Sequence, residues 1–170
     1  LHALGITPQV DLPGVGENLQ DHLQLGMIYK IKGAPTLNTR AGSWAGRMKI
    51  GLEYALFQSG PMSMAPSQLG AFARSDDSQA TPNLQYHVQP LSLEKFGEPL
   101  HPFPAFTASV CNLRPTSRGH VRICKNDSYA PPKITPNYLS TPEDRRTAAA
   151  ALGVTRKIVS SPALAKYQPE

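Results

Sequence analysis

Residues 84–89 read LQYHVQ, a stretch in which every second residue is apolar and the residues between them are polar. Successive side chains of an extended strand point to opposite faces of a sheet, so this alternation predicts a strand with one buried face. The same period recurs nearer the start of the chain, at Leu25, Met27, Tyr29 and Ile31. Each stretch is expected to turn one face towards a hydrophobic core.

Around these stretches, 17 prolines and 13 glycines divide the chain into short segments, which favours strands over long helices. Residues 106–113 and 120–123 are predicted to form a hairpin around a polar turn at residues 116–119. Cys111 and Cys124 flank this hairpin, where cross-strand neighbours come within disulfide reach. Two buried free thiols are nevertheless preferred to a disulfide.

Two segments show helical spacing. The first runs from about residue 43 to residue 58 and ends at Gly60 and Pro61. Its apolar stripe, expected to lie in the core rather than at a ligand site, consists of Trp44, Met48, Leu52 and Ala55.

The second helix begins at Thr141, a hydroxyl cap followed by a proline and two acids, and it ends before Pro162. Its expected buried face consists of Ala148, Ala151, Leu152, Thr155, Ile158 and Val159. The fold class predicted is α+β, an antiparallel sheet flanked by helices.

Composition excludes several classes of protein. The 170 residues are 40% hydrophobic and 17% charged, which is typical of one globular domain with a real core. No apolar run reaches the roughly 18 residues that a membrane span needs. The net charge of +5 comes from scattered basic residues, and a phosphate-binding surface requires clustered positive charge, so nucleic-acid binding is not expected.

Two glycines, Gly14 and Gly16, have the spacing that opens a dinucleotide-binding loop. The third glycine of that loop is replaced by Leu19, and no helix is predicted to follow. The pair alone therefore does not indicate a phosphate-binding loop.

Two longer blocks are far more specific. Residues 11–22 read DLPGVGENLQDH, and residues 112–121 read NLRPTSRGHV, followed by PNYL at residues 136–139. These blocks resemble the signature stretches of the glucose-methanol-choline (GMC) oxidoreductases, and their order and separation fit that family. The resemblance covers essentially the whole chain.

The resemblance implies a fold and an activity. Members of the family bind FAD on a Rossmann-like domain and oxidise alcohols by passing hydride to the flavin. The resemblance implies that residues 1–23 are the end of the FAD-binding portion and a linker. Residues 24–170 are then the substrate-binding domain, which continues into the C-terminal region of the family, and the Rossmann-like FAD domain is largely absent. The catalytic histidine and its partner are expected beyond Glu170, so no residue of this chain is assigned as catalytic and none as a metal ligand.

Two groups of residues become candidate site residues. The candidates for cofactor binding are Asn18, Gln20, Asp21 and His22, which either contact FAD or brace the linker between the two domains. The candidates for substrate binding are Gln68, Gln85 and His87, which lie on or beside predicted strands. Arg114 and Arg118 could bind an anionic substrate, but a structural role beside the turn is preferred.

Gln68 bears on the substrate. The resemblance places an acidic residue here in relatives that oxidise choline, where it would suit a quaternary ammonium, whereas Gln68 is neutral. An uncharged primary alcohol is therefore expected, while the electron acceptor stays open. The scarcity of cysteines favours a cytoplasmic enzyme.

A second interpretation, independent of the resemblance, is a noncatalytic module that binds carbohydrate or protein. A basic, sheet-rich chain with Trp44 and six tyrosines would suit that role. The two interpretations predict different surfaces. Part of a flavoenzyme is expected to expose apolar side chains where the flavin domain would lie. A third possibility, a scaffold that has lost catalysis, is less favoured.

Overall fold

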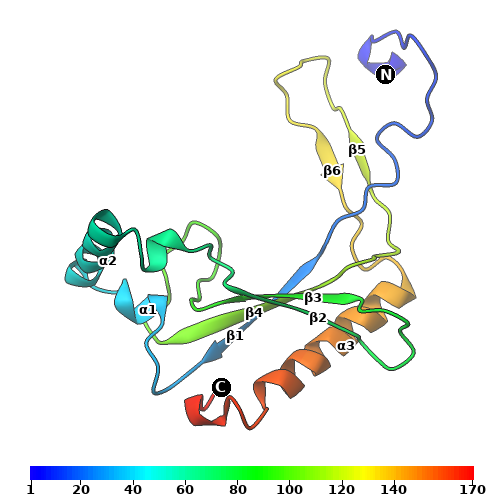
Figure 1. Ribbon diagram of the computed structural model, residues 1–170. Coiled ribbons are helices and arrows are strands. Elements are labelled where there is room, and N and C mark those ends of the chain that lie inside the picture. The colour runs from blue at the N-terminus through cyan, green and yellow to red at the C-terminus, as the bar shows by residue number, and fades with distance from the viewer.

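A computed structural model describes residues 1–170, and its centre is a four-stranded antiparallel sheet in the order β1-β4-β3-β2 (Figure 1). Every neighbouring pair in this sheet is antiparallel. The strands are β1 (Gln24–Lys30), β2 (Leu69–Ala73), β3 (Leu84–Gln89) and β4 (Ala105–Asn112). The two stretches with alternating residues are therefore strands, as predicted, and the predicted α+β class is confirmed.

Helices lie on one face and at one end of this sheet (Figure 1). Helix α3 (Pro142–Val159) runs along the face, while α1 (Leu37–Arg40) and α2 (Trp44–Phe57) lie together at the end. A second, two-stranded sheet of β5 (His120–Arg122) and β6 (Lys133–Thr135) projects from the other end, beside the N-terminal segment. Short 3-10 turns occupy His2–Leu4, Pro61–Ser63 and Ala165–Tyr167.

The core lies between the sheet and α3. Leu84, Tyr86 and Val110 pack there with Ala151 of the helix, and all four are 3% exposed or less. The Tyr86 hydroxyl lies 3.1 Å from Oγ1 of buried Thr155, so the phenol satisfies its polar atom inside the core. Packing the apolar face of β3 against this helix is what makes the alternation of residues 84–89 structurally decisive.

Helix α3 begins where its sequence predicts. The Thr141 side chain accepts a hydrogen bond from the Asp144 amide at 3.2 Å, and Pro142 is the first helical residue. Of the expected buried face, Ala151, Thr155 and Val159 are buried, whereas Ile158 is 45% exposed.

The predicted hairpin between residues 106–113 and 120–123 is wrong. Strand β4 pairs with β1 and β3, while β5 pairs with β6 in the second sheet. The segment between β4 and β5 cannot close a hairpin because its backbone donors are used elsewhere: Leu113 donates to the Asn83 carbonyl, and Pro115 has no N–H. The cysteines at its two ends are free thiols, Cys111 buried and Cys124 exposed.

The apolar stripe of α2 was expected to be buried, and this prediction is also wrong. The helix starts as predicted, with the Ser43 hydroxyl accepting from the Gly46 amide at 3.0 Å. Trp44, Met48 and Leu52 are nevertheless 76%, 54% and 59% exposed, and Ile50 is the buried residue of this helix. Helical spacing identifies an apolar face, but it does not say which part of a protein covers that face.

Two glycine substitutions should have opposite effects on stability. A Cβ at Gly119 would collide with the backbone carbonyls of Thr135 and Pro136, so Gly119→Ala should lower the free energy of unfolding by about 1–3 kcal/mol. Gly153 in α3 has open space around it, so Gly153→Ala should raise that energy by about 0.5–1 kcal/mol. Urea unfolding measures both, and equal effects of the two changes would contradict the described packing.

Candidate functional site

The face of the sheet opposite α3 carries a group of polar side chains. Gln85, His87 and Gln89 of β3 alternate with the core residues and so point away from the helix. Their partners on β4 are Cys111, Ser109 and Thr107 in register. We call this surface the polar face and define it by Gln85, His87, Gln89, Thr107 and Ser109.

The central row of the polar face has glycine at both ends. The register places Gly70 beside His87, His87 beside Ser109, and Ser109 beside Gly26. A Cβ placed on Gly26 would lie in ordinary van der Waals contact with the Ser109 hydroxyl oxygen at 3.8 Å, so the two positions are direct neighbours. Glycine inside a strand often marks a place where another group approaches the backbone closely. This row therefore places an imidazole beside a hydroxyl, with no side chain on the residue at either end.

Of the three residues predicted to bind substrate, the structure brings two together. Gln85 and His87 share the polar face. Gln68 immediately precedes β2, and its backbone N–H donates to the Val88 carbonyl at 3.1 Å. Gln68 is exposed and borders a hollow of about 330 Å³ that is also lined by Thr36, Arg40 and Met64. It lies at the edge of the candidate site rather than in the central row.

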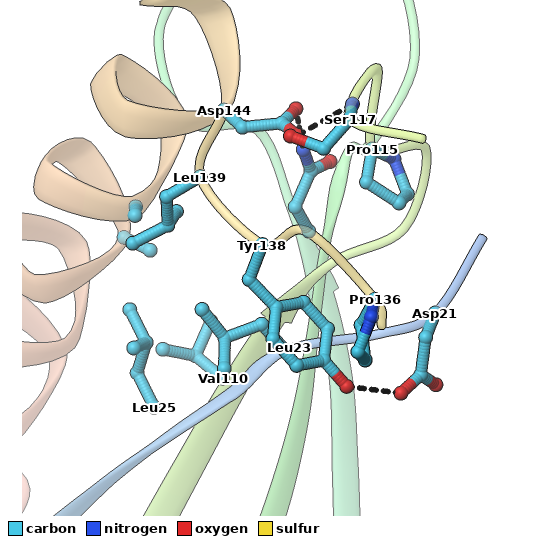
Figure 2. Close-up of a pocket in the computed structure, with 13 residues that line it drawn as sticks. Asp21, Leu23, Leu25, Val110, Pro115, Ser117, Pro136, Tyr138, Leu139 and Asp144 are labelled. Atoms are coloured by element: carbon cyan, nitrogen blue, oxygen red, sulfur yellow. Dashed lines mark hydrogen bonds between the residues drawn. The ribbon is translucent and has the colours of Figure 1, made fainter. Parts of the chain in front are cut away.

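The polar cluster near the N-terminus braces the chain. Gln20 Nε2 donates to the Pro115 carbonyl at 3.2 Å, and His22 Nε2 lies 3.0 Å from the Leu113 carbonyl oxygen. Asp21 accepts a short hydrogen bond from the Tyr138 hydroxyl (Figure 2). That bond lowers the pKa of Asp21 and raises the pKa of Tyr138. The hydrogen bonds of Gln20, Asp21 and His22 therefore brace the segment before β1, whereas flavin contact by the cluster stays a prediction.

Asp144 holds the segment between β4 and β5. Its carboxylate accepts from the Thr116 amide at 2.9 Å and from the Asn112 side chain at 3.3 Å. It also accepts from the Ser117 amide at 2.8 Å (Figure 2). Burial of the carboxyl raises its pKa, but hydrogen bonds from Ser117 and Thr116 outweigh burial and leave the pKa below the usual value. Sequence reasoning placed Asp144 only as an acid complementing the helix start, because nothing in the pattern shows the contact with the loop.

The two signature blocks meet at this point. The hollow between them, lined among others by Asp21, Val110, Ser117, Tyr138 and Asp144, has a volume of about 30 Å³, which is room for roughly one water molecule (Figure 2). It is too small for a substrate. The junction of the signature blocks is therefore structural.

The arginines of the second block also have structural roles. Arg114 donates to the Pro82 carbonyl at 3.2 Å, and Arg118 donates to the Pro115 carbonyl at 2.8 Å. Both guanidinium groups hold loop carbonyls, as the sequence interpretation preferred. Across residues 1–170, no group of three or more His, Cys, Asp or Glu side chains is arranged to hold a metal ion. No helix of the chain is long and apolar enough to cross a membrane.

Comparison with known proteins agrees with this architecture. Residues 115–170 match a family model described as GMC oxidoreductase. The oxygen-dependent choline dehydrogenase of Proteus mirabilis (strain HI4320) is 36% identical over 170 residues, which is 100% of this chain and 30% of that protein. The enzyme of the same name from Pectobacterium carotovorum subsp. carotovorum (strain PC1) is 38% identical over 168 residues, 99% of this chain and 30% of that protein.

Solved structures show the same fold. Pyridoxine 4-oxidase from Mesorbium loti superposes with a TM-score of 0.73 at 25% identity, covering 98% of this chain and 29% of that one. Formate oxidase from Aspergillus oryzae RIB40 superposes with a TM-score of 0.83 at 17% identity, covering 99% of this chain and 34% of that one.

The chain is thus similar along its whole length to choline dehydrogenases, and its residues 115–170 match the glucose-methanol-choline oxidoreductase family model. It spans 30% of the length of the curated relatives it matches. These matches support the oxidoreductase interpretation and give no support to a carbohydrate-binding or protein-binding module.

The Asp144 carboxylate should make stability depend on pH. Because its folded pKa lies below the unfolded value, its contribution is present above about pH 4 and is lost as pH falls through the folded pKa. Asp144→Asn should lower the free energy of unfolding at pH 7 by about 2–3 kcal/mol, since the Thr116 and Ser117 amides lose an ionised acceptor. It should also flatten the acid side of the profile.

Glu143→Gln is the matched control for this prediction, because Glu143 is the neighbouring acid of the same helical turn and is exposed. It should change stability by less than about 0.5 kcal/mol. Urea unfolding from pH 7 down to acid pH measures both variants. An Asp144→Asn protein with the stability and pH profile of the Glu143→Gln protein would contradict the role of this carboxylate.

Proposed function

We propose that this chain is the substrate-binding part of an FAD-dependent oxidoreductase that acts on the CH–OH group of alcohols. The observation that carries the proposal is the polar face, whose central row places His87 and Ser109 side by side between two glycines. Similarity to the GMC oxidoreductases supports it, because the chain matches their family model, a choline dehydrogenase and pyridoxine 4-oxidase.

FAD would supply the acceptor for the hydride that leaves the carbinol carbon. The residues of this chain fit a position beside such a cofactor rather than around it. Gly14 and Gly16 lie in turns that lead to the extended backbone before β1 instead of opening a helix, so the dinucleotide-binding unit would come from elsewhere in the protein. Asn18, held in the left-handed region at φ 59°, makes no side-chain hydrogen bond, and its amide is free to contact the cofactor.

The polar face would bind and orient the alcohol. An imidazole and a hydroxyl can each donate or accept a hydrogen bond, so His87 and Ser109 can hold a substrate hydroxyl from one side. Fixing that hydroxyl fixes the carbinol carbon, and such positioning contributes strongly to rate. The base that removes the hydroxyl proton is assigned to no residue of this chain.

The charge of the polar face favours an uncharged primary alcohol. The side chains on this side of the sheet include no Asp or Glu in any of the four strands, and Gln68 at its edge is neutral. A quaternary ammonium is usually recognised by aromatic rings or carboxylates, and Phe72 is the one aromatic side chain of the strands on this side. The proposed substrate thus differs from the choline named for the curated relatives.

Gln68→Glu in the whole protein should shift preference towards a cationic alcohol. The new carboxylate should raise kcat/KM for choline relative to benzyl alcohol by about tenfold, which corresponds to about 1.4 kcal/mol. Gln58→Glu, on the exposed C-terminal cap of α2, is the control and should leave the ratio unchanged. An unsubstituted protein that already oxidises choline far faster than aliphatic or aromatic alcohols would refute the proposed substrate class.

Loss of the imidazole at the centre of the polar face should weaken turnover. His87→Ala should lower kcat/KM for alcohols by about 10- to 100-fold, because a hydrogen bond that orients the substrate is lost. His120→Ala, in the second sheet, should have little effect. Steady-state kinetics, with flavin content and thermal unfolding measured on the same samples, separates lost orientation from lost folding. Unchanged kcat/KM in His87→Ala would remove the polar face from the proposed site.

A further inference from the structure

The two side chains of the central row, His87 and Ser109, have no hydrogen-bond partner within the chain. Ser109 is only 9% exposed, and polar side chains buried to this extent are normally hydrogen-bonded. Neither residue has a polar side-chain atom that is both fully enclosed and unpaired, so the Ser109 hydroxyl and the His87 ring nitrogens are reached from outside. The row therefore carries hydrogen-bonding groups that the fold itself leaves unused.

The two ends of the central row differ in the space beside them. A Cβ built on Gly26 would touch two side chains of β4, at 3.8 and 4.0 Å. A Cβ built on Gly70 would touch a backbone atom, the Tyr86 carbonyl oxygen at 3.5 Å, and, apart from its neighbours in the chain, no side chain within 4 Å. Strand β2 is also the last strand of the sheet on this side. A molecule held at His87 therefore has more room across Gly70 than across Gly26.

An exposed aromatic ring stands next to this space. Phe72 and Gly70 are two positions apart in an extended strand, so both point to the polar face. The register pairs Phe72 with Gln85, one row from His87. The Phe72 ring is 63% exposed and takes part in no aromatic pair of the chain. A bare ring thus lies about 7 Å along the strand from a residue without a side chain.

We propose that Gly70 and Phe72 select the substrate, and that they select a primary alcohol carried on a flat, uncharged ring. The ring would lie across Gly70, where the missing side chain allows a close approach to the backbone. Aromatic rings pair with their centroids about 4.5–7 Å apart, and the spacing between the two positions of β2 falls in that range. The carbinol would then reach His87 and Ser109. Selection of a ring by these two residues rests on the function proposed above and adds to it the groups that set the shape of the substrate.

Gly70→Ala in the whole protein tests the space. The added methyl group contacts backbone at an ordinary distance, so thermal unfolding should occur at the same or a slightly higher temperature. It should nevertheless lower kcat/KM for benzyl alcohol by about tenfold or more, because the ring can no longer approach the strand, and change kcat/KM for ethanol by less than about twofold. Gly153→Ala, which adds a methyl group in open space on α3, is the matched control and should leave the ratio of the two constants unchanged.

Phe72→Leu tests the ring contact and keeps an apolar side chain at this position. It should weaken the binding of benzamide, a flat uncharged ring with no carbinol to oxidise, by about fivefold, because a ring-on-ring contact is lost. Gly70→Ala should weaken the same binding by about tenfold. Titration followed by saturation-transfer NMR measures the dissociation constant of benzamide without turnover.

Two kinds of failure can be told apart. Oxidation of no alcohol by the unsubstituted protein would refute the proposed function, and the selection by Gly70 and Phe72 with it. An active protein in which Gly70→Ala and Phe72→Leu lower kcat/KM for benzyl alcohol and ethanol equally, or leave both unchanged, would overturn the selection alone. Benzamide binding that neither substitution weakens would also overturn the selection alone.

Discussion

The carboxylate of Asp144 is the interaction on which the arrangement of this chain depends. It lies in the first turn of α3, yet its acceptor oxygens are filled by donors from the loop that leaves β4. A buried carboxylate is costly unless its oxygens are hydrogen-bonded, and here backbone amides satisfy them at short distance. One ionised group therefore joins the helix that covers the core to the loop that carries the chain into the second sheet.

The cluster of Gln20, Asp21 and His22 attaches the N-terminal segment to the same loop. Hydrogen bonds to the carbonyls of Pro115 and Leu113, together with the Tyr138 contact, join residues separated by 91 to 117 positions in the sequence. Both signature blocks thus serve to hold the sheet, the second sheet and the N-terminal segment in one arrangement. These contacts lie at the end of the four-stranded sheet from which β5 and β6 project (Figure 1).

Local patterns predicted the elements of this fold well, and they predicted long-range contacts poorly. Alternation at residues 84–89 and the cap at Thr141 depend on neighbours within a few positions, so both were correct. The supposed hairpin failed because the pairing of β4 is decided by β1 and β3, which lie far away in sequence. The stripe of α2 failed for a related reason: spacing identifies an apolar face without identifying its partner. The grouping of Gln85 with His87 could be predicted from alternation, whereas Ser109 and the flanking glycines required the register.

The central row of the polar face is built from one residue on each of four strands, Gly70, His87, Ser109 and Gly26. None of these residues adjoins another in the sequence, and the strand neighbours of His87 and Ser109 include the core residues Tyr86 and Val110. A change to the whole row therefore requires substitutions in four separate segments of the chain, with the intervening residues kept constant. Mutagenesis libraries that randomise contiguous windows of β3 or β4 would change core residues, whereas libraries that vary this row as a unit would change the polar face and leave the core intact.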